Sequence, residues 1–149
     1  MYAHILIATD GSELAQKGLD HGLSLAKGLG AKVTVLNVSE PAPIFASAGM
    51  YGPVATAEDI VAYQRAGEAY GAKVLDAAMA QAEKLGVNAE AVHVEEMWAA
   101  EAINQIAKDH GCDLIVMASH GRRGLGRLIL GSQTVDVLTN SQVPVLVVR

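Results

Sequence analysis

Cysteine, aromatic residues and basic charge are scarce in this sequence, and each shortage excludes a class of protein. Cys112 is the single cysteine, so no internal disulfide can form and the chain is not a disulfide-stapled secreted domain. Aromatic residues make up 4% of the chain, which disfavours an aromatic-rich β-sandwich. The net charge is −5, so the chain as a whole lacks the basic surface that nucleic acid requires.

Long apolar runs are also missing. The opening MYAHILIATD reaches Asp10 too early for the apolar core of a signal peptide. No apolar run approaches the roughly 18 residues that a membrane span needs. We therefore expect a cytoplasmic protein whose partners include neither a membrane nor a nucleic acid.

The abundant residues are Ala, Val, Leu and Gly, in apolar runs that alternate with amphipathic segments. We expect strands over 4–9, 32–38, 89–95, 113–119 and 143–148. Helical spacing predicts helices from about Ser12 to Gly30, from Thr56 to Leu85, and over about 98–110 and 132–139. This alternation predicts the α/β class: a single domain, 1–149, with a doubly wound, five-stranded parallel sheet of the flavodoxin or Rossmann-like type and helices on both faces.

The connection between the second and third strands is unusually long. Residues 39–57 are rich in proline and glycine and are expected to form a loop. Thr56 and Asp59 then have the spacing of a capping box, with Asp in the usual Glu position. The helix that follows should be softened at Gly67 and Gly71, at a cost of about 1 kcal/mol each relative to alanine.

A ligand crevice in a doubly wound sheet lies at the carboxyl ends of the strands, where the winding reverses. The loops with the most site-like residues follow the first strand (10–12) and the fourth strand (119–131). If these two strands are neighbours, the loops face each other across one crevice. Asp10 would then face a ligand, although shaping the turn is an equally good account of this residue.

The stretch MASHGRRGLGRLILGSQT, residues 117–134, has the glycines of a phosphate-binding loop but fits neither common pattern. As a P-loop, the segment from Gly126 to Ser132 lacks the essential lysine. As a dinucleotide-binding turn, it has Ile129 where the third glycine belongs.

A third arrangement fits better. Gly121 follows the fourth strand, nine residues come next, and Gly131-Ser132 opens a short helix. The free N–H groups and dipole of such a helix start favour an anion, and Ser132 adds a hydroxyl donor. Arg122 and Arg123 can supply full positive charges beside it.

Taken together, ILIATDGS, LNV, DLIVMASHGRRGLGRLILGSQT and VPVLVV resemble the universal stress protein family over essentially the whole chain. ATP-binding members of that family carry the motif G-x2-G-x9-G-S/T. Gly121, Gly131 and Ser132 match it, whereas Ala118 replaces the first glycine. The resemblance implies an ATP-binding, nucleotide-dependent stress-response or signalling module. ATP hydrolysis would be slow at most, and Mg²⁺ would be held largely by the phosphates and water.

The resemblance also implies residue roles. Asp10 would bond the ribose hydroxyls, Val38 would meet the adenine edge through its backbone, and Ala8 and Met117 would line the base. His120 is a further candidate contact, with shaping of the loop as its alternative role. The complete set of expected cofactor-binding residues is Ala8, Thr9, Asp10, Val38, Met117, Ala118, His120, Gly121, Arg122, Arg123, Gly131, Ser132, Gln133 and Thr134.

Catalytic and metal-binding patterns are missing from the sequence. The five histidines fall on different predicted elements, with no pair at a ligand spacing. Ser12 has no general base at a recognisable spacing, and Cys112 adjoins the apolar run DLIVMA, which predicts a buried and unreactive thiol. We therefore expect no catalytic residue and no metal ligand.

The terminal VPVLVV has the features of an edge strand, because Pro144 cannot donate a backbone hydrogen bond. An apolar edge invites pairing, and the resemblance implies a homodimer through residues 143–148. Burial under the monomer's own helices is the alternative.

Two other functions stay open. The same fold could act through an unknown signalling partner without nucleotide, which Ala118 favours. An adenine-nucleotide α-hydrolase-type enzyme is the other, but ATDGSE holds neither of the motifs that such enzymes place after an early strand.

Overall fold

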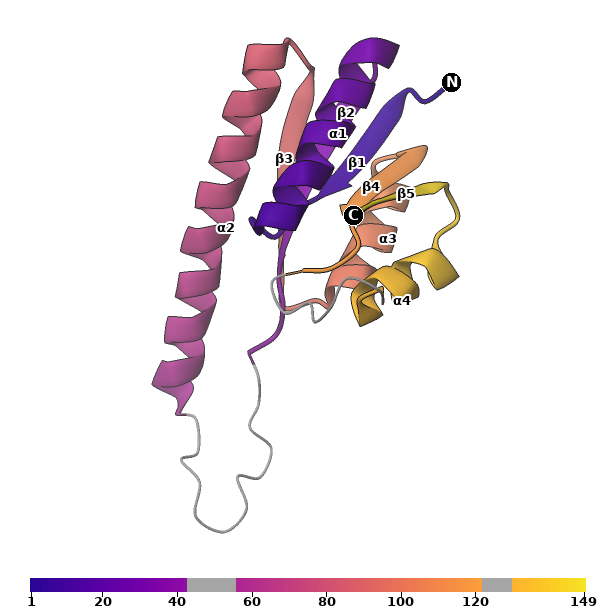
Figure 1. Cartoon of the computed structure of the whole chain (residues 1–149). Coiled ribbons are helices and arrows are strands. Elements are labelled where there is room, and N and C mark those ends of the chain that lie inside the picture. Colours follow the sequence, from indigo (N-terminus) through magenta and orange to yellow (C-terminus); the bar gives the residue numbers. More distant parts are fainter. Residues whose placement is uncertain (43–55, 122–129) are drawn as a thin grey trace.

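The computed structural model of this protein describes residues 1–42, 56–121 and 130–149. Its strands form one parallel sheet of five strands in the order β3-β2-β1-β4-β5 (Figure 1). The predicted class and alternation are therefore confirmed. Along the chain the elements are β1 (His4–Ala8), α1 (Glu13–Leu29), β2 (Lys32–Ser39), α2 (Ala57–Leu85), β3 (Ala89–Glu95), α3 (Ala99–Asp109), β4 (Leu114–Ala118), α4 (Ser132–Asn140) and β5 (Val145–Val148).

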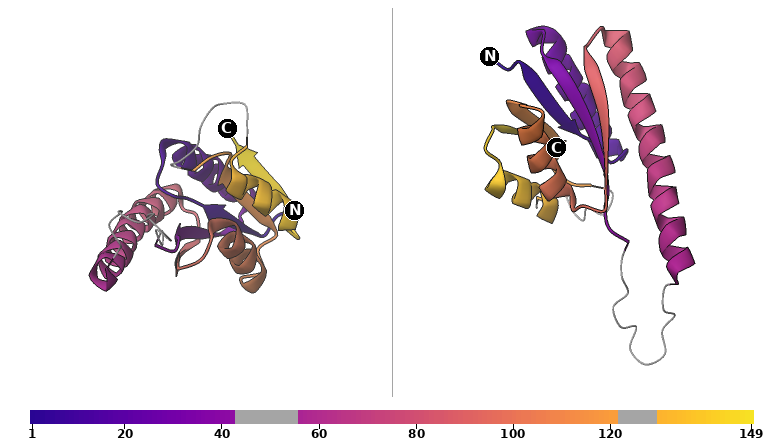
Figure 2. Two further views of the ribbon diagram at one scale, coloured as in Figure 1. Left: turned by 90° about the horizontal axis from the view of Figure 1, so that it is seen from below. Right: turned by 180° about the vertical axis from the view of Figure 1, so that it is seen from behind.

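Helices cover both faces of the sheet, as Figure 2 shows. Side chains alternate along each strand, so Ile5 and Ile7 of β1 face α1 and α2 while Leu6 faces α3 and α4. Each face therefore has its own apolar cluster, centred on residues such as Leu23 of α1 and Ile103 of α3. This double burial explains why the strands are continuous apolar runs in the sequence.

The helix starts at α1 and α2 follow from local sequence. Ser12 caps α1 by accepting the N–H of Ala15, and Thr56 and Asp59 form the predicted capping box at α2. Both helices end at a glycine in the left-handed region, Gly30 and Gly86. Within the described ranges, none of the helices is both long and apolar enough to cross a bilayer.

Helix α2 is continuous through Gly67 and Gly71, as the prediction of one long helix required. A Cβ on Gly71 would lie 2.5 Å from Cε1 of His93, and one on Gly67 would lie 3.1 Å from Oγ of Ser39. These glycines therefore let α2 pack closely on β2 and β3, and the N-terminal part of α2 continues beyond the end of the sheet (Figure 1).

Other differences from the predictions are small. The predicted strand 143–148 begins at Val145, because Pro144 contributes its carbonyl to Ile115 but has no N–H to donate. The predicted loop 39–57 is shorter at both ends, since Ser39 belongs to β2 and Ala57 begins α2. Residues 43–55 of that loop lie outside the described residues.

Candidate functional site

The winding of the sheet reverses between β1 and β4. From β1 the chain moves outward to β2 and β3, and it then returns to the other side of β1 to form β4. The two strands pair in parallel, with Leu6 opposite Ile115. The conditional prediction that these strands are neighbours is confirmed. The loops that follow them therefore lie side by side at the carboxyl ends of the strands, where a ligand crevice is expected.

Asp10 and Gly121 meet across this crevice. A Cβ placed on Gly121 would lie only 2.8 Å from Oδ2 of Asp10. The other carboxylate oxygen, Oδ1, accepts the N–H of Ser12 at 2.9 Å. Asp10 therefore shapes its turn with one oxygen while the other is directed toward the loop after β4, so the two accounts of this residue are compatible.

Two residues that the sequence reasoning missed hold the Asp10 turn. Asn37 at the end of β2 donates its side-chain N–H to the carbonyl of Thr9 at 2.9 Å. Tyr70 on α2 donates its hydroxyl to the carbonyl of Asp10, also at 2.9 Å. Asn37 could have been noticed as an amide side chain among the apolar residues that end β2, whereas Tyr70 gives no such signal.

Helix α4 points its start at the same crevice. Its N-cap, Gly131, has no side chain to accept the first N–H groups, and its own N–H donates to the carbonyl of Ser119 at 3.0 Å. Helices α1 and α2, by contrast, are capped by their own side chains. An uncapped start with its positive dipole end favours an anion.

His120 lies beside this helix start. Its Nδ1 is 2.9 Å from Oγ of Ser119, and Cδ2 is 3.8 Å from the position a Gly131 Cβ would take. Its Nε2 is buried and has no hydrogen-bond partner among the described residues. The neighbouring candidates Arg122 and Arg123 lie outside the described residues.

The side chains of Gln133 and Thr134 are engaged in hydrogen bonds within the fold. The Thr134 hydroxyl is buried and donates to the carbonyl of Ser119 at 2.9 Å. The Gln133 side chain accepts the N–H of Ala100 at 2.8 Å and so caps α3. Their expected phosphate contacts therefore depend on their backbone N–H groups. The side chain of Ser132 is exposed at the helix start.

Ala8 and Met117, expected to line the base, and Val38, expected to meet the adenine edge through its backbone, belong to one apolar surface. Met117 of β4 is a member of the cluster between the sheet and α3 and α4, and Ala8 and Val38 pack against the same cluster. Each lies near the carboxyl end of its strand. Strand β1 pairs with β2 only as far as Leu36, so the last residues of β2 present an edge without a β1 partner toward the crevice.

Ala118 occupies a regular strand position. It ends β4, pairs with Val148, and has the extended backbone that any residue adopts. Alternation places its methyl on the same face as Val116, which is covered by α1, and opposite to Met117. The backbone therefore does not require a glycine at this position.

Comparison with known proteins identifies the family. A model of the universal stress protein family matches residues 1–149. The chain belongs to this family. Universal stress protein YxiE of Bacillus subtilis is 35% identical over 150 residues, which cover 100% of both chains.

Solved structures agree with this assignment. The structure of hypothetical protein MJ0577 of Methanocaldococcus jannaschii superposes with a TM-score of 0.85 at 29% identity, covering 99% of this chain and 96% of that one. The universal stress protein from Archaeoglobus fulgidus in complex with dAMP superposes with a TM-score of 0.68 at 21% identity, covering 99% and 98%. This second likeness shows the universal stress protein fold.

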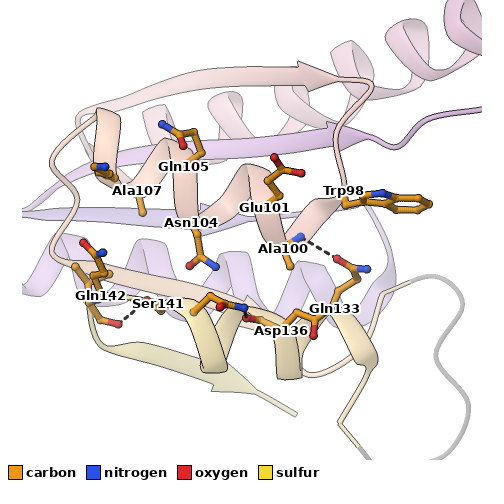
Figure 3. Close-up of a pocket in the computed structure, with 13 residues that line it drawn as sticks. Trp98, Ala100, Glu101, Asn104, Gln105, Ala107, Gln133, Asp136, Ser141 and Gln142 are labelled. Carbon is orange, nitrogen blue, oxygen red and sulfur yellow. Dashed lines mark hydrogen bonds between the residues drawn. The ribbon is translucent and has the colours of Figure 1, made fainter.

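A separate hollow of about 920 Å³ lies between α3 and α4 (Figure 3). Amide and charged side chains such as Asn104 and Asp136 line it, and Trp98 lies exposed at one end. Among the candidate binding residues that the structure describes, Gln133 alone lines it, and its side chain turns toward Ala100 (Figure 3). We therefore place the candidate site of this universal stress protein at the carboxyl ends of β1 and β4, where Gly121 lies against Asp10 and His120 lies beside the start of α4.

Proposed function

We propose that this universal stress protein binds ATP in the β1–β4 crevice and acts in the cytoplasm as a nucleotide-dependent stress-response or signalling module. One observation carries the proposal. The carboxylate of Asp10 faces Gly121, and a Cβ added to Gly121 would lie 2.8 Å from Oδ2 of Asp10. The start of α4, which no side chain of its own N-cap residue caps, follows in the same loop region. An acceptor for hydroxyls thus lies next to a cradle for an anion, which is the pairing that a nucleotide requires.

The adenosine part of the ligand fits the side of the crevice nearest β2. The Asp10 carboxylate would accept the ribose hydroxyls, and Ala8 and Met117 would contact the base. Beyond Leu36 the backbone of β2 has no β1 partner, so Val38 can offer its main-chain groups to the adenine edge. The dAMP complex of the Archaeoglobus fulgidus protein supports an adenine nucleotide as the ligand class.

The phosphates would lie at the start of α4. Gly121 and Gly131 would bring the main chain close to them, Ser132 would offer its exposed hydroxyl, and the buried Nε2 of His120 would be an additional partner. Thr9, Arg122 and Arg123 complete the proposed set, with the arginines offsetting the net charge of −5. Bound Mg²⁺ would be held through the phosphates and water, and ATP hydrolysis would be slow at most.

We favour nucleotide binding over the nucleotide-independent alternative. That alternative drew on the methyl of Ala118, which strand alternation assigns to the α1 face of the sheet. We also propose that two copies associate through residues 143–148, because β5 is an edge strand with Leu146 exposed. The signalling partner is unspecified.

Mass spectrometry of small molecules released from the purified protein, followed by calorimetric titration with ATP and AMP, tests the proposal. We expect a co-purifying adenine nucleotide or a micromolar dissociation constant, which corresponds to about 8 kcal/mol. An absence of binding to either nucleotide at millimolar concentration would refute it.

A further inference from the structure

The turn that carries Asp10 is held at two consecutive carbonyls by side chains from two different elements. Asn37 of β2 donates to the carbonyl of Thr9 and Tyr70 of α2 donates to the carbonyl of Asp10, each at 2.9 Å. Asn37 is only 3% exposed, so its bond is shielded from water. Since the orientation of a carbonyl fixes its peptide plane, these contacts restrict the backbone on which the Asp10 side chain is mounted.

Glycines on both sides make this contact possible. Gly11 has φ +77°, and a Cβ there would lie 2.5 Å from the Tyr70 hydroxyl oxygen. On the helix, a Cβ at Gly71 would lie 2.6 Å from Oδ1 of Asn37. A larger residue at either position would move α2 away from the turn. The close approach of α2 to Asp10 therefore depends on glycine at both positions.

The same turn also sets the direction of the carboxylate. Oδ1 of Asp10 is fixed by the N–H of Ser12 at 2.9 Å, which directs Oδ2 toward Gly121. If the peptide after Asp10 rotates, the N–H donors that follow it rotate as well, and the carboxylate loses its orientation. Tyr70 therefore controls Asp10 from outside the crevice.

We propose that Tyr70 is a positioning residue for Asp10 and that, through Asp10, it sets the preference of the site for nucleotides with intact ribose hydroxyls. This inference rests on the proposed function of Asp10 as the ribose acceptor. Helix α2 thereby has a defined part in ligand selection, although Tyr70 itself does not touch the nucleotide.

The variant Tyr70→Phe removes only the hydroxyl, and Tyr63→Phe is its matched control. Tyr63 lies on the same helix and is 40% exposed. Calorimetric titration compares AMP with 2′,3′-dideoxy-AMP. Tyr70→Phe should weaken AMP binding about fivefold, the effect of one lost hydrogen bond, and change dideoxy-AMP binding less than about twofold. Tyr63→Phe should change neither. Equal losses for both ligands, or no loss, would overturn the proposal.

A double-mutant cycle separates action through Asp10 from a direct effect. Asp10→Asn keeps one oxygen for the Ser12 N–H but lacks the charge of the carboxylate. In that background, Tyr70→Phe should change AMP affinity less than about twofold, because the group that Tyr70 positions has already lost its function. A full fivefold loss in the Asp10→Asn protein would show that Tyr70 acts by another route.

A nucleotide-free measurement keeps this inference distinct from the proposed function. Amide hydrogen exchange at Ser12 reports its bond to Asp10, and it should become about five times faster in Tyr70→Phe and stay unchanged in Tyr63→Phe. If the wild-type protein bound no nucleotide while Ser12 exchanged faster in Tyr70→Phe, the positioning of Asp10 would stand and the nucleotide proposal would fail. Unchanged exchange at Ser12 would overturn the positioning role.

Discussion

Small residues shape the candidate site, because main-chain and side-chain groups approach each other closely there. A Cβ added to Gly121 would lie 2.8 Å from the Asp10 carboxylate. A Cβ added to Gly131 would lie 3.3 Å from the carbonyl oxygen of Ser119. At either position a methyl group would force a neighbour to move. At Ala118 a methyl is already present, but on the α1 face of the sheet.

Replacing Ala118 with glycine tests whether that methyl affects the ligand. Because the methyl faces α1, Ala118→Gly should leave ATP affinity within about twofold of wild type and lower the free energy of unfolding by about 1 kcal/mol through greater chain entropy. Titration calorimetry and urea unfolding measure the two effects. Markedly tighter ATP binding would show instead that the methyl crowds the nucleotide.

The role of a residue could be predicted from sequence patterns only where that role depends on residues nearby in the chain. Gly121 and Gly131 follow from their spacing, and Cys112 from the apolar run beside it. That thiol is 5% exposed, and burial raises its pKa to about 11, so it stays protonated at neutral pH. Asn37 and Tyr70 contact residues 28 and 60 positions away, and no local pattern specifies such pairs.

At the scale of elements, polar contacts join β2, β3 and α3 near the amino-terminal ends of the two strands, away from the candidate site. Oε1 of Glu90 on β3 accepts hydrogen bonds from His110 at 2.9 Å and from Thr34 at 2.8 Å, and Lys32 lies 3.2 Å away. The bond from His110, then that from Thr34, hold the pKa of Glu90 at about 2, below its usual 4.5. The ionised carboxylate therefore ties the three elements together.

This carboxylate makes stability depend on pH. Since its pKa is lower in the folded protein, its contribution is present above about pH 4.5 and is lost as pH falls toward 2. The Glu90 side chain is 38% exposed, so solvent screening limits its contribution to about 1 kcal/mol or less. Urea unfolding should show Glu90→Gln less stable than wild type at pH 7 and equal to it near pH 2. A difference that persists unchanged at pH 2 would contradict this account.

Element boundaries were predictable where capping residues mark them, as with Ser12 and Thr56. The packing role of Gly67 and Gly71 was not predictable. Helix propensity describes a glycine only as a weak point of the helix, and it carries no information about the side chain on the facing strand. Here that side chain is Ser39 or His93, and the glycines allow tight packing against it.

At the scale of the whole molecule, the strand order leaves β5 at an edge of the sheet. Its Leu146 is 39% exposed, and Val135 and Leu138 of α4 are also exposed. The alternation of strands and helices predicted the layers of the fold, but it left the β1–β4 adjacency conditional. Strand order depends on pairings between distant segments, which one sequence does not specify.

The proposed homodimer makes a further prediction. Leu146→Lys places a charge on the edge strand and should convert a dimer to a monomer in sedimentation velocity. Val61→Lys, at a 44% exposed position on α2, is the matched control and should remain dimeric. A monomeric wild-type protein, or a Leu146→Lys protein that stays dimeric, would rule out association through β5.

Calorimetric titration of ATP into Gly121→Ala protein tests the location of the nucleotide site most directly. A methyl at this position would lie 2.8 Å from the Asp10 carboxylate, whereas one at Gly28 of α1 would meet nothing within 4 Å. Wild type and Gly28→Ala should bind ATP equally, and Gly121→Ala should bind it at least about tenfold more weakly, the effect of losing one hydrogen bond to a charged group. Equal affinity in all three proteins would contradict a nucleotide site between β1 and β4.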